Sequence, residues 1–168
     1  MVRDVHERRL LQPVQGCRPL IESLAGPHDE LWPTGRWPAM RFDRPLGVGA
    51  VGGHGPIRYR VEQYEPGQRI RFRFTAPRGF DGFHEYELIP AAGDECVLRH
   101  SLVARMRWPA ALTYPLIYRP LHAALMTDSL DRAALFTGTP VDAAHRWSRW
   151  VRLLRWIVSR VRRRVRAR

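Results

Sequence analysis

Residues 109–137 read PAALTYPLIYRPLHAALMTDSLDRAALFT, and the second part of this stretch predicts a long helix. Pro120 suits the first turn of a helix, where its missing N–H costs no hydrogen bond, and Gly138 is suited to end it. On a helical wheel, one face of Pro120–Phe136 and the residues just before it is mostly apolar, with one His and one Ser set into it: Tyr118, Leu121, His122, Leu125, Ser129, Ala133 and Phe136. Such a mixed face suits a helix that lines a cavity as well as one that fills a solid core. Asp128 and Asp131 fall elsewhere, and we expect them to be surface charges on the solvent side.

The net charge of the chain is concentrated at its C-terminal end. The 168 residues include 28 Arg and no Lys, and the formal net charge is +12. Ten of the Arg follow residue 145, where there is no Asp or Glu, so 12 − 10 leaves about +2 for residues 1–145. The high pI therefore belongs to a tail, which argues against a nucleic-acid-binding domain. We expect one domain at 1–138, a linker at 139–145 and an Arg-rich amphipathic tail at 146–168.

Several classes of protein do not fit the sequence. Cys17 and Cys96 make no disulfide framework, and no Cys/His spacing typical of a zinc site occurs. The first residues are too polar for a secretory signal, and no run reaches the roughly 20 apolar residues of a membrane-spanning helix. We therefore expect a cytoplasmic protein without a metal or cofactor. Peripheral attachment to the inner face of the membrane is the alternative that the tail leaves open.

The first half of the chain predicts short elements separated by turn residues. We expect a strand at Val2–Leu11, a helix at Val14–Leu24, a helical turn around His28–Trp32 and a brief strand at Ala39–Asp43. Residues 47–52 read GVGAVG, a literal GxGxxG, but a dinucleotide site requires a helix directly after the glycines. An alternating strand follows instead, so we interpret this segment as a strongly bent, glycine-rich strand.

From residue 57 onward, polar and apolar residues alternate with turn signals between them, which predicts antiparallel hairpins. The expected strands are Ile57–Tyr64, Arg69–Thr75, Phe80–Ile89 and Glu95–Arg105. Keeping the faces matched across the hairpins gives an outer row whose charges alternate, as favourable cross-strand pairs do: Glu62, Arg71, Glu85 and Arg99. The same register gives an inner row of Val61, Phe72, His84 and His100. It therefore predicts that the last two side chains lie directly opposite each other on the concave face.

This order of elements resembles the helix-grip fold of the START and birch-pollen-allergen superfamily (SRPBCC). Four short stretches of sequence are similar to those of its polyketide cyclase/dehydrase-like bacterial members: Leu31–Pro33, His54–Ile57, Gly67–Phe74 and Arg119–His122. The resemblance covers roughly residues 3–138. It implies an α+β fold in which a curved antiparallel sheet of about seven strands wraps a long C-terminal helix, with two short helices after the first strand. The superfamily includes carriers, sensors and enzymes, so the fold alone does not name a function.

The resemblance implies a cavity between sheet and helix for a small hydrophobic, lipid- or polyketide-like molecule. The residues expected to line it are Tyr59, Phe72, Phe74, His84, Tyr86, Leu98, His100, Tyr118, His122, Leu125 and Ser129. The three residues Trp32, Trp37 and Trp108 could rim its mouth or pack in the core. As cross-strand neighbours about 4.5–5.5 Å apart at Cβ, His84 and His100 could anchor a carbonyl or hydroxyl group, or act as the acid/base pair of a cyclase or dehydratase. The alternatives are a buried pair that only stabilises the fold, and a closed-core interaction protein that acts through its tail.

The tail predicts an amphipathic helix of its own. One stripe contains Trp147, Trp150, Val151, Leu154, Ile157, Val158, Val161 and Val165, and the opposing side contains Arg149, Arg152, Arg155, Arg160 and Arg163. Trp and aliphatic residues opposite Arg are typical of a helix in the interface of an anionic membrane. The alternatives are packing of its first half on the domain, and contact with RNA or DNA, for which no groove-reading motif is present. The expected membrane or partner surface contains Trp147, Trp150, Arg152, Arg155 and Ile157.

Overall fold

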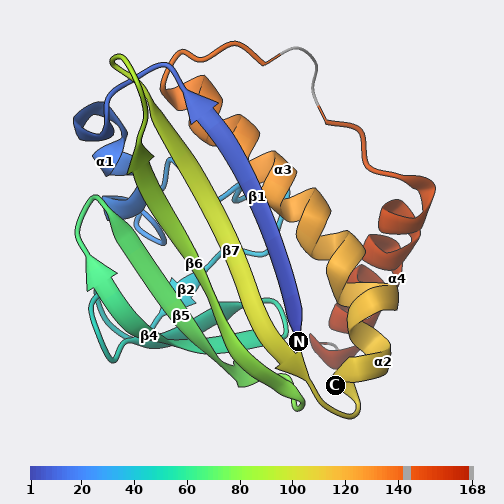
Figure 1. The fold of residues 1–168 in the computed structure, drawn as a ribbon. Coiled ribbons are helices and arrows are strands. Elements are labelled where there is room, and N and C mark those ends of the chain that lie inside the picture. The colour runs from blue at the N-terminus through green and yellow to red at the C-terminus, as the bar shows by residue number, and fades with distance from the viewer. Residues whose placement is uncertain (142–144, 167–168) are drawn as a thin grey trace.

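The computed structural model describes residues 1–141 and 145–166, with the side chains of residues 161–166 outside the description. Its centre is a seven-stranded antiparallel sheet in the order β1-β7-β6-β5-β4-β3-β2 (Figure 1). The strands are β1 (Val2–Leu10), β2 (Arg41–Phe42), β3 (Val51–His54), β4 (Ile57–Glu65), β5 (Arg69–Ala76), β6 (Phe80–Pro90) and β7 (Cys96–Met106). Consecutive antiparallel connections join β2 to β7 into a meander, and β1 pairs with β7 and forms the edge of the sheet beside it. The expected sheet is confirmed. Residues 47–49, which were expected to belong to a strongly bent strand, form a bend and a turn, and β3 begins only at Val51.

The helices lie on one face of this sheet. They are α1 (Val14–Glu22), α2 (Ala110–Thr113), the π-helical turn η1 (Tyr114–Tyr118), α3 (Arg119–Phe136) and α4 (Arg149–Arg166). In Figure 1, α3 runs along the sheet beside β1, and α4 packs next to α3. Within the described residues, no helix is both long enough and apolar enough to cross a membrane. The long C-terminal helix that the sequence predicts for the domain is α3, and α4 is a further helix that follows it.

The pairing of β4, β5 and β6 follows the expected register on the inner face. Val61 lies opposite Phe72, and Phe72 lies opposite His84. Between β6 and β7 the prediction is wrong, because His84 pairs with Leu102 and His100 pairs with Tyr86. The two histidines are therefore offset by two residues and are not directly opposed.

The outer row differs from the expected one at two places, for two reasons. Arg71 faces Glu85 as expected, but Arg99 faces Glu87 instead of Glu85. An irregularity in β4 after Val61 also displaces Glu62, which forms its ion pair with Arg73. A shift of two residues leaves every side chain on its original face, so the alternating pattern cannot detect it.

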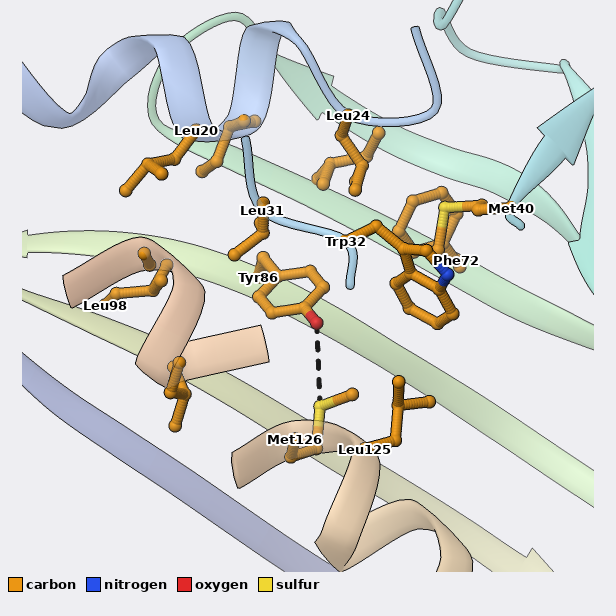
Figure 2. Close-up of a cluster of buried hydrophobic side chains, with 14 of the residues drawn as sticks. Leu20, Leu24, Leu31, Trp32, Met40, Phe72, Tyr86, Leu98, Leu125 and Met126 are labelled. Atoms are coloured by element: carbon orange, nitrogen blue, oxygen red, sulfur yellow. Dashed lines mark hydrogen bonds between the residues drawn. The ribbon is translucent and has the colours of Figure 1, made fainter. Parts of the chain in front are cut away.

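The core lies between α1, the sheet and the middle of α3. Ser129 on α3 donates a hydrogen bond to the carbonyl oxygen of Leu31 at 3.0 Å, and its Oγ also lies 3.0 Å from the Tyr86 hydroxyl. Figure 2 shows the Tyr86 hydroxyl pointing at the sulfur of Met126, 3.6 Å away. These contacts fix α3 against β6. Phe136, expected on the same face of the helix, is instead 41% exposed in its last turn.

The segment between α1 and β2 is held by one carboxylate. Residues 28–32 form turns and bends where a helical turn was expected. The Asp29 side chain accepts hydrogen bonds from the backbone N–H groups of Ala25, Leu31 and Trp32, at 2.7, 2.9 and 2.7 Å. An Asp side chain that takes several backbone donors competes with the helical hydrogen-bond pattern, which explains the turn. The same contacts place Trp32 over the interior.

Candidate functional site

A cavity of about 600 Å³ lies between the sheet, η1, α3 and α4. This volume is within the range of about 300–1,000 Å³ that is typical of small-molecule sites. The π-helical turn η1 contributes Tyr114, Ile117 and Tyr118 to the wall, and α3 adds Leu121 and Leu125. A π-helical turn is wider than an α-helical one and is often found at functional sites. The wall is therefore largely aromatic and aliphatic.

Two buried histidines interrupt this apolar wall. His84 on β6 and His100 on β7 are 5% and 1% exposed, and Nδ1 of His84 lies 3.3 Å from Nε2 of His100. Burial disfavours the charged imidazolium and holds the pKa of each ring well below its ordinary value. Both rings are therefore neutral near pH 7, with one N–H donor and one acceptor nitrogen each.

The pair leaves hydrogen-bonding capacity unused. Whichever ring donates across the 3.3 Å contact, one remaining nitrogen of the pair is a donor and the other is an acceptor. These two atoms, Nε2 of His84 and Nδ1 of His100, have no hydrogen-bond partner among the described residues. Unpaired buried polar groups are costly, so the pair is suited to a molecule that brings a hydroxyl or carbonyl group.

A third histidine extends the row to the first strand. His122 on α3 lies 5.0 Å from His100 between ring centroids, and its Nδ1 is 3.2 Å from Oδ2 of Asp4. The other oxygen of Asp4 is 3.3 Å from Nε2 of His6. The hydrogen bond from His122, and then that from His6, holds the pKa of the Asp4 carboxyl well below its usual range. Burial lowers the pKa of His122 despite this carboxylate.

Comparison with solved structures identifies the fold. The chain is similar to norcoclaurine synthase from Thalictrum flavum, with 16% identity, 80% of this chain and 86% of that chain covered, and a TM-score of 0.59. It is also similar to CalU16 from Micromonospora echinospora, with 16% identity, coverage of 95% and 84%, and a TM-score of 0.57. A Thermobifida fusca protein gives 14% identity, coverage of 88% and 100%, and a TM-score of 0.57. This chain has the helix-grip fold.

The expected α+β helix-grip fold is therefore confirmed. No protein-family model and no curated protein sequence matches the chain. At these identities the solved structures establish the fold and not the activity.

About half of the residues that were expected to line the cavity between the sheet, η1, α3 and α4 do so. Those that do are Phe74, His84, His100, Tyr118, His122 and Leu125. The others are buried in the core and are not part of the cavity wall: Tyr59, Phe72, Tyr86, Leu98 and Ser129. Trp32 and Trp37 line the cavity as one interpretation expected, whereas Trp108 is exposed elsewhere.

Sequence reasoning missed two groups of residues near the cavity. Asp4 and His6 were not among the candidates, although their spacing of two residues on β1 places them on one face of the sheet. Arg155, Val158 and Ser159 of α4 also line the cavity, because α4 folds back over its mouth. Packing of the first half of the tail on the domain was one alternative, but no local sequence signal predicts that α4 reaches the cavity.

Asp128 is the largest correction at the level of single residues. It was expected on the solvent side but is 3% exposed, and its Oδ2 accepts hydrogen bonds from the indole N–H groups of Trp37 and Trp147 at 2.6 and 3.0 Å. Arg36 approaches its other oxygen at 3.0 Å. Asp131 is also largely shielded, and it forms an ion pair with Arg8.

The α4 residues that were expected on a membrane or partner surface divide into two groups. Trp147 packs on the domain, and the Arg155 guanidinium stacks on it at 3.9 Å and on Trp37 at 4.3 Å. Trp150, Arg152 and Ile157 are exposed. The side chains of Val161, Arg163 and Val165, and part of the expected linker, lie outside the described residues.

Proposed function

We propose that the chain binds one small hydrophobic molecule in its helix-grip cavity. The observation that supports this proposal is a cavity of about 600 Å³ whose largely apolar wall contains unpartnered histidine nitrogens. An apolar body would be driven into such a site by the hydrophobic effect. The few polar atoms would then fix its orientation.

The chemistry of the wall suggests the class of ligand. Within the described residues, Nε2 of His84, Nδ1 of His100 and Nε2 of His122 lack hydrogen-bond partners. All three rings belong to the cavity wall. A lipid-like or polyketide-like molecule with a hydroxyl or carbonyl group would satisfy these atoms, whereas a pure hydrocarbon would leave them unpaired.

A substitution that fills the cavity tests this function. Leu125 lines the cavity and is 4% exposed, so Leu125→Trp should abolish binding of the neutral fluorescent probe N-phenyl-1-naphthylamine. Because the cavity has room for the larger ring, the free energy of unfolding should fall by less than the about 1–3 kcal/mol that overpacking a solid core costs. Probe fluorescence and urea unfolding are the measurements.

The matched control is Leu135→Trp, since Leu135 is on the same helix but 70% exposed. It should leave probe binding unchanged. If the wild-type chain does not bind the probe and Leu125→Trp is badly destabilised, the interior is closed and the carrier function is wrong.

The second candidate function is a cyclase or dehydratase that uses His84 and His100 as acid and base. The observation in its favour is that two neutral imidazoles in contact at 3.3 Å border the cavity, since a neutral imidazole can accept a proton from a bound substrate. Native mass spectrometry of the full chain purified from its own host separates the two functions. An unchanged hydrophobic molecule released from wild type and from His84→Phe supports carriage. A different mass released from the variant supports catalysis.

We also propose that α4 attaches the protein to an anionic membrane surface. Trp150, Leu153 and Ile157 form one exposed stripe on α4, and the Trp150 indole N–H donates to the carbonyl oxygen of Leu116 at 2.9 Å, which joins the stripe to the exposed Leu116. Exposed Arg residues flank the stripe, and α4 contains no Asp or Glu. An apolar stripe with cationic borders complements a bilayer interface rich in anionic lipid.

A further inference from the structure

Three side chains that could hold a metal ion converge where β1 meets the first turns of α3. Asp4 and His6 come from β1 and His122 comes from α3, and one ligand atom from each lies within 4.8 Å of the others. All three side chains are largely shielded from solvent, with exposures of 18%, 21% and 16%. We propose that Asp4, His6 and His122 form a binding site for a divalent metal ion of the zinc type.

The spacing of the ligand atoms fits such an ion. Oδ1 of Asp4 is 3.3 Å from Nε2 of His6, and Oδ2 of Asp4 is 3.2 Å from Nδ1 of His122. Zinc binds nitrogen and carboxylate oxygen at about 2.0–2.1 Å, and tetrahedral angles then separate two ligand atoms by about 3.3–3.4 Å. These two distances involve different oxygens of Asp4, and the three ligand atoms lie within 4.8 Å of one another. Side-chain rotations that bring one Asp4 oxygen and the two histidine nitrogens to about 3.3–3.4 Å from one another would complete the set.

The protonation states also fit. A metal on Nδ1 of His122 leaves the ring proton on Nε2, which has no partner among the described residues. The His100 ring, whose Nδ1 is likewise unpartnered in the described part of the chain, lies 5.0 Å from the His122 ring between centroids. Metal-bound histidines usually donate their second N–H to a neighbouring acceptor, and a small movement of the two rings would let His100 accept it.

Three protein ligands leave a coordination position for water or substrate, as in catalytic zinc sites. His122 lines the cavity, and so does Tyr114, whose hydroxyl donates to Oδ2 of Asp4 at 3.5 Å. The metal site therefore borders the cavity, and its remaining position could be taken by water or by a polar group of a bound molecule. The proposed metal site does not depend on whether the chain also carries a hydrophobic molecule in the cavity.

Zinc and cobalt titrations of the untagged full chain test the site. Wild type should bind one Zn²⁺ per chain by calorimetry, and Co²⁺ should give the intense visible absorption of a tetrahedral complex. Asp4→Ala and His122→Ala should each weaken Zn²⁺ binding by at least about 100-fold, at or beyond the upper end of the about 10–100-fold loss caused by removing an outer hydrogen-bond partner. Circular dichroism checks that each variant folds, and His6→Gln is the replacement if either does not.

One histidine variant serves as the control. His28 is exposed and lies outside the proposed ligand set. His28→Ala should keep the zinc affinity within about twofold of wild type, because it removes no ligand atom. If Asp4→Ala, His122→Ala or His6→Gln binds zinc as tightly as wild type, or if wild type binds less than one ion per chain, the proposal is wrong. Probe binding is measured separately, so that result leaves the proposed carriage function untouched.

Discussion

His84 lies among rings that three strands supply. The ring centroids of Tyr59 and Phe72 are 4.9 and 5.0 Å away, and those of Phe74 and His100 are 5.1 and 5.5 Å away. No carboxylate is recorded against this ring in the described part of the chain, and His54 and His122 disfavour its charged form as well. Burial therefore keeps His84 neutral in the folded protein, whereas an unfolded chain would protonate it in mild acid.

This difference predicts a pH dependence of stability. The folded pKa of His84 is lowered, so below the ordinary pKa of histidine the unfolded chain binds a proton that the folded chain does not. The free energy of unfolding should fall with decreasing pH, and His84 should contribute about 1.4 kcal/mol per pH unit between roughly pH 6 and pH 5. Urea unfolding of His84→Phe should show a slope smaller by about that amount. The exposed His28→Ala should keep the wild-type slope; an unchanged slope in His84→Phe would contradict this account.

At the scale of elements, α4 is attached to the domain by polar and cationic contacts as well as by apolar packing. Val151 and Leu154 bury the apolar side of its first turns. Trp147, just before the helix, donates to the buried Asp128, and Arg155 stacks between Trp37 and Trp147. A buried carboxylate needs its donors, so the contact with Asp128 stabilises the docked position of α4.

Removing one donor should therefore loosen α4. Trp147→Phe keeps an aromatic ring for Arg155 but removes the N–H that bonds to Asp128, and we expect the free energy of unfolding to fall by about 1–3 kcal/mol. Trp156→Phe is the matched control, because Trp156 is half exposed on the same helix and should change stability by less than about 0.5 kcal/mol. Urea unfolding compares the two. Equal effects would mean that the hydrogen bond to Asp128 does not stabilise the docked helix.

At the scale of the whole molecule, α4 has two sides with different partners. One side packs on the domain and lines the cavity through Arg155, Val158 and Ser159. The other side exposes the stripe that includes Trp150 and Ile157. The proposed membrane surface therefore lies on the same helix that closes part of the proposed ligand site.

The membrane proposal predicts a lipid-dependent association. Full-length protein should co-sediment with phosphatidylserine-containing vesicles, weakly with neutral phosphatidylcholine vesicles, and less at high salt, since each Arg near an anionic surface contributes about 1 kcal/mol that salt screens. Trp150→Ala with Ile157→Ala should weaken co-sedimentation at unchanged charge, because both side chains are exposed on the stripe.

Val48→Ala is the control for lost exposed apolar area, since Val48 is 70% exposed in the loop before β3. It should bind vesicles as wild type does. Equal binding of the double variant, or equal binding to neutral and anionic vesicles, would rule out the stripe as the anchor. Binding of nucleic acid would also be salt-sensitive, but it should be insensitive to the double change.

Local patterns in the sequence determined the elements and their order. Alternation of polar and apolar residues fixed β4 to β7, and the mixed face of α3 placed His122 and Leu125 toward the interior. These features depend on periods of two and about 3.6 residues, which neighbouring residues set by themselves. For this reason, the elements and several wall residues of the cavity could be predicted before any coordinates, and the resemblance of their order to the helix-grip fold supplied the fold.

The tertiary structure decided which distant residues meet, because sequence periods of two and about 3.6 residues carry no information about contacts between distant segments. The shift between β6 and β7 keeps every face, so only the folded hairpin shows that His84 meets His100 diagonally. Asp4 and His122 are 118 positions apart, and they meet because β1 pairs with the last strand beneath α3. Asp128 is buried beneath two indole N–H groups, from Trp37 and from Trp147 just before α4. Each of these contacts depends on packing between distant segments, whose free energy no local sequence pattern records.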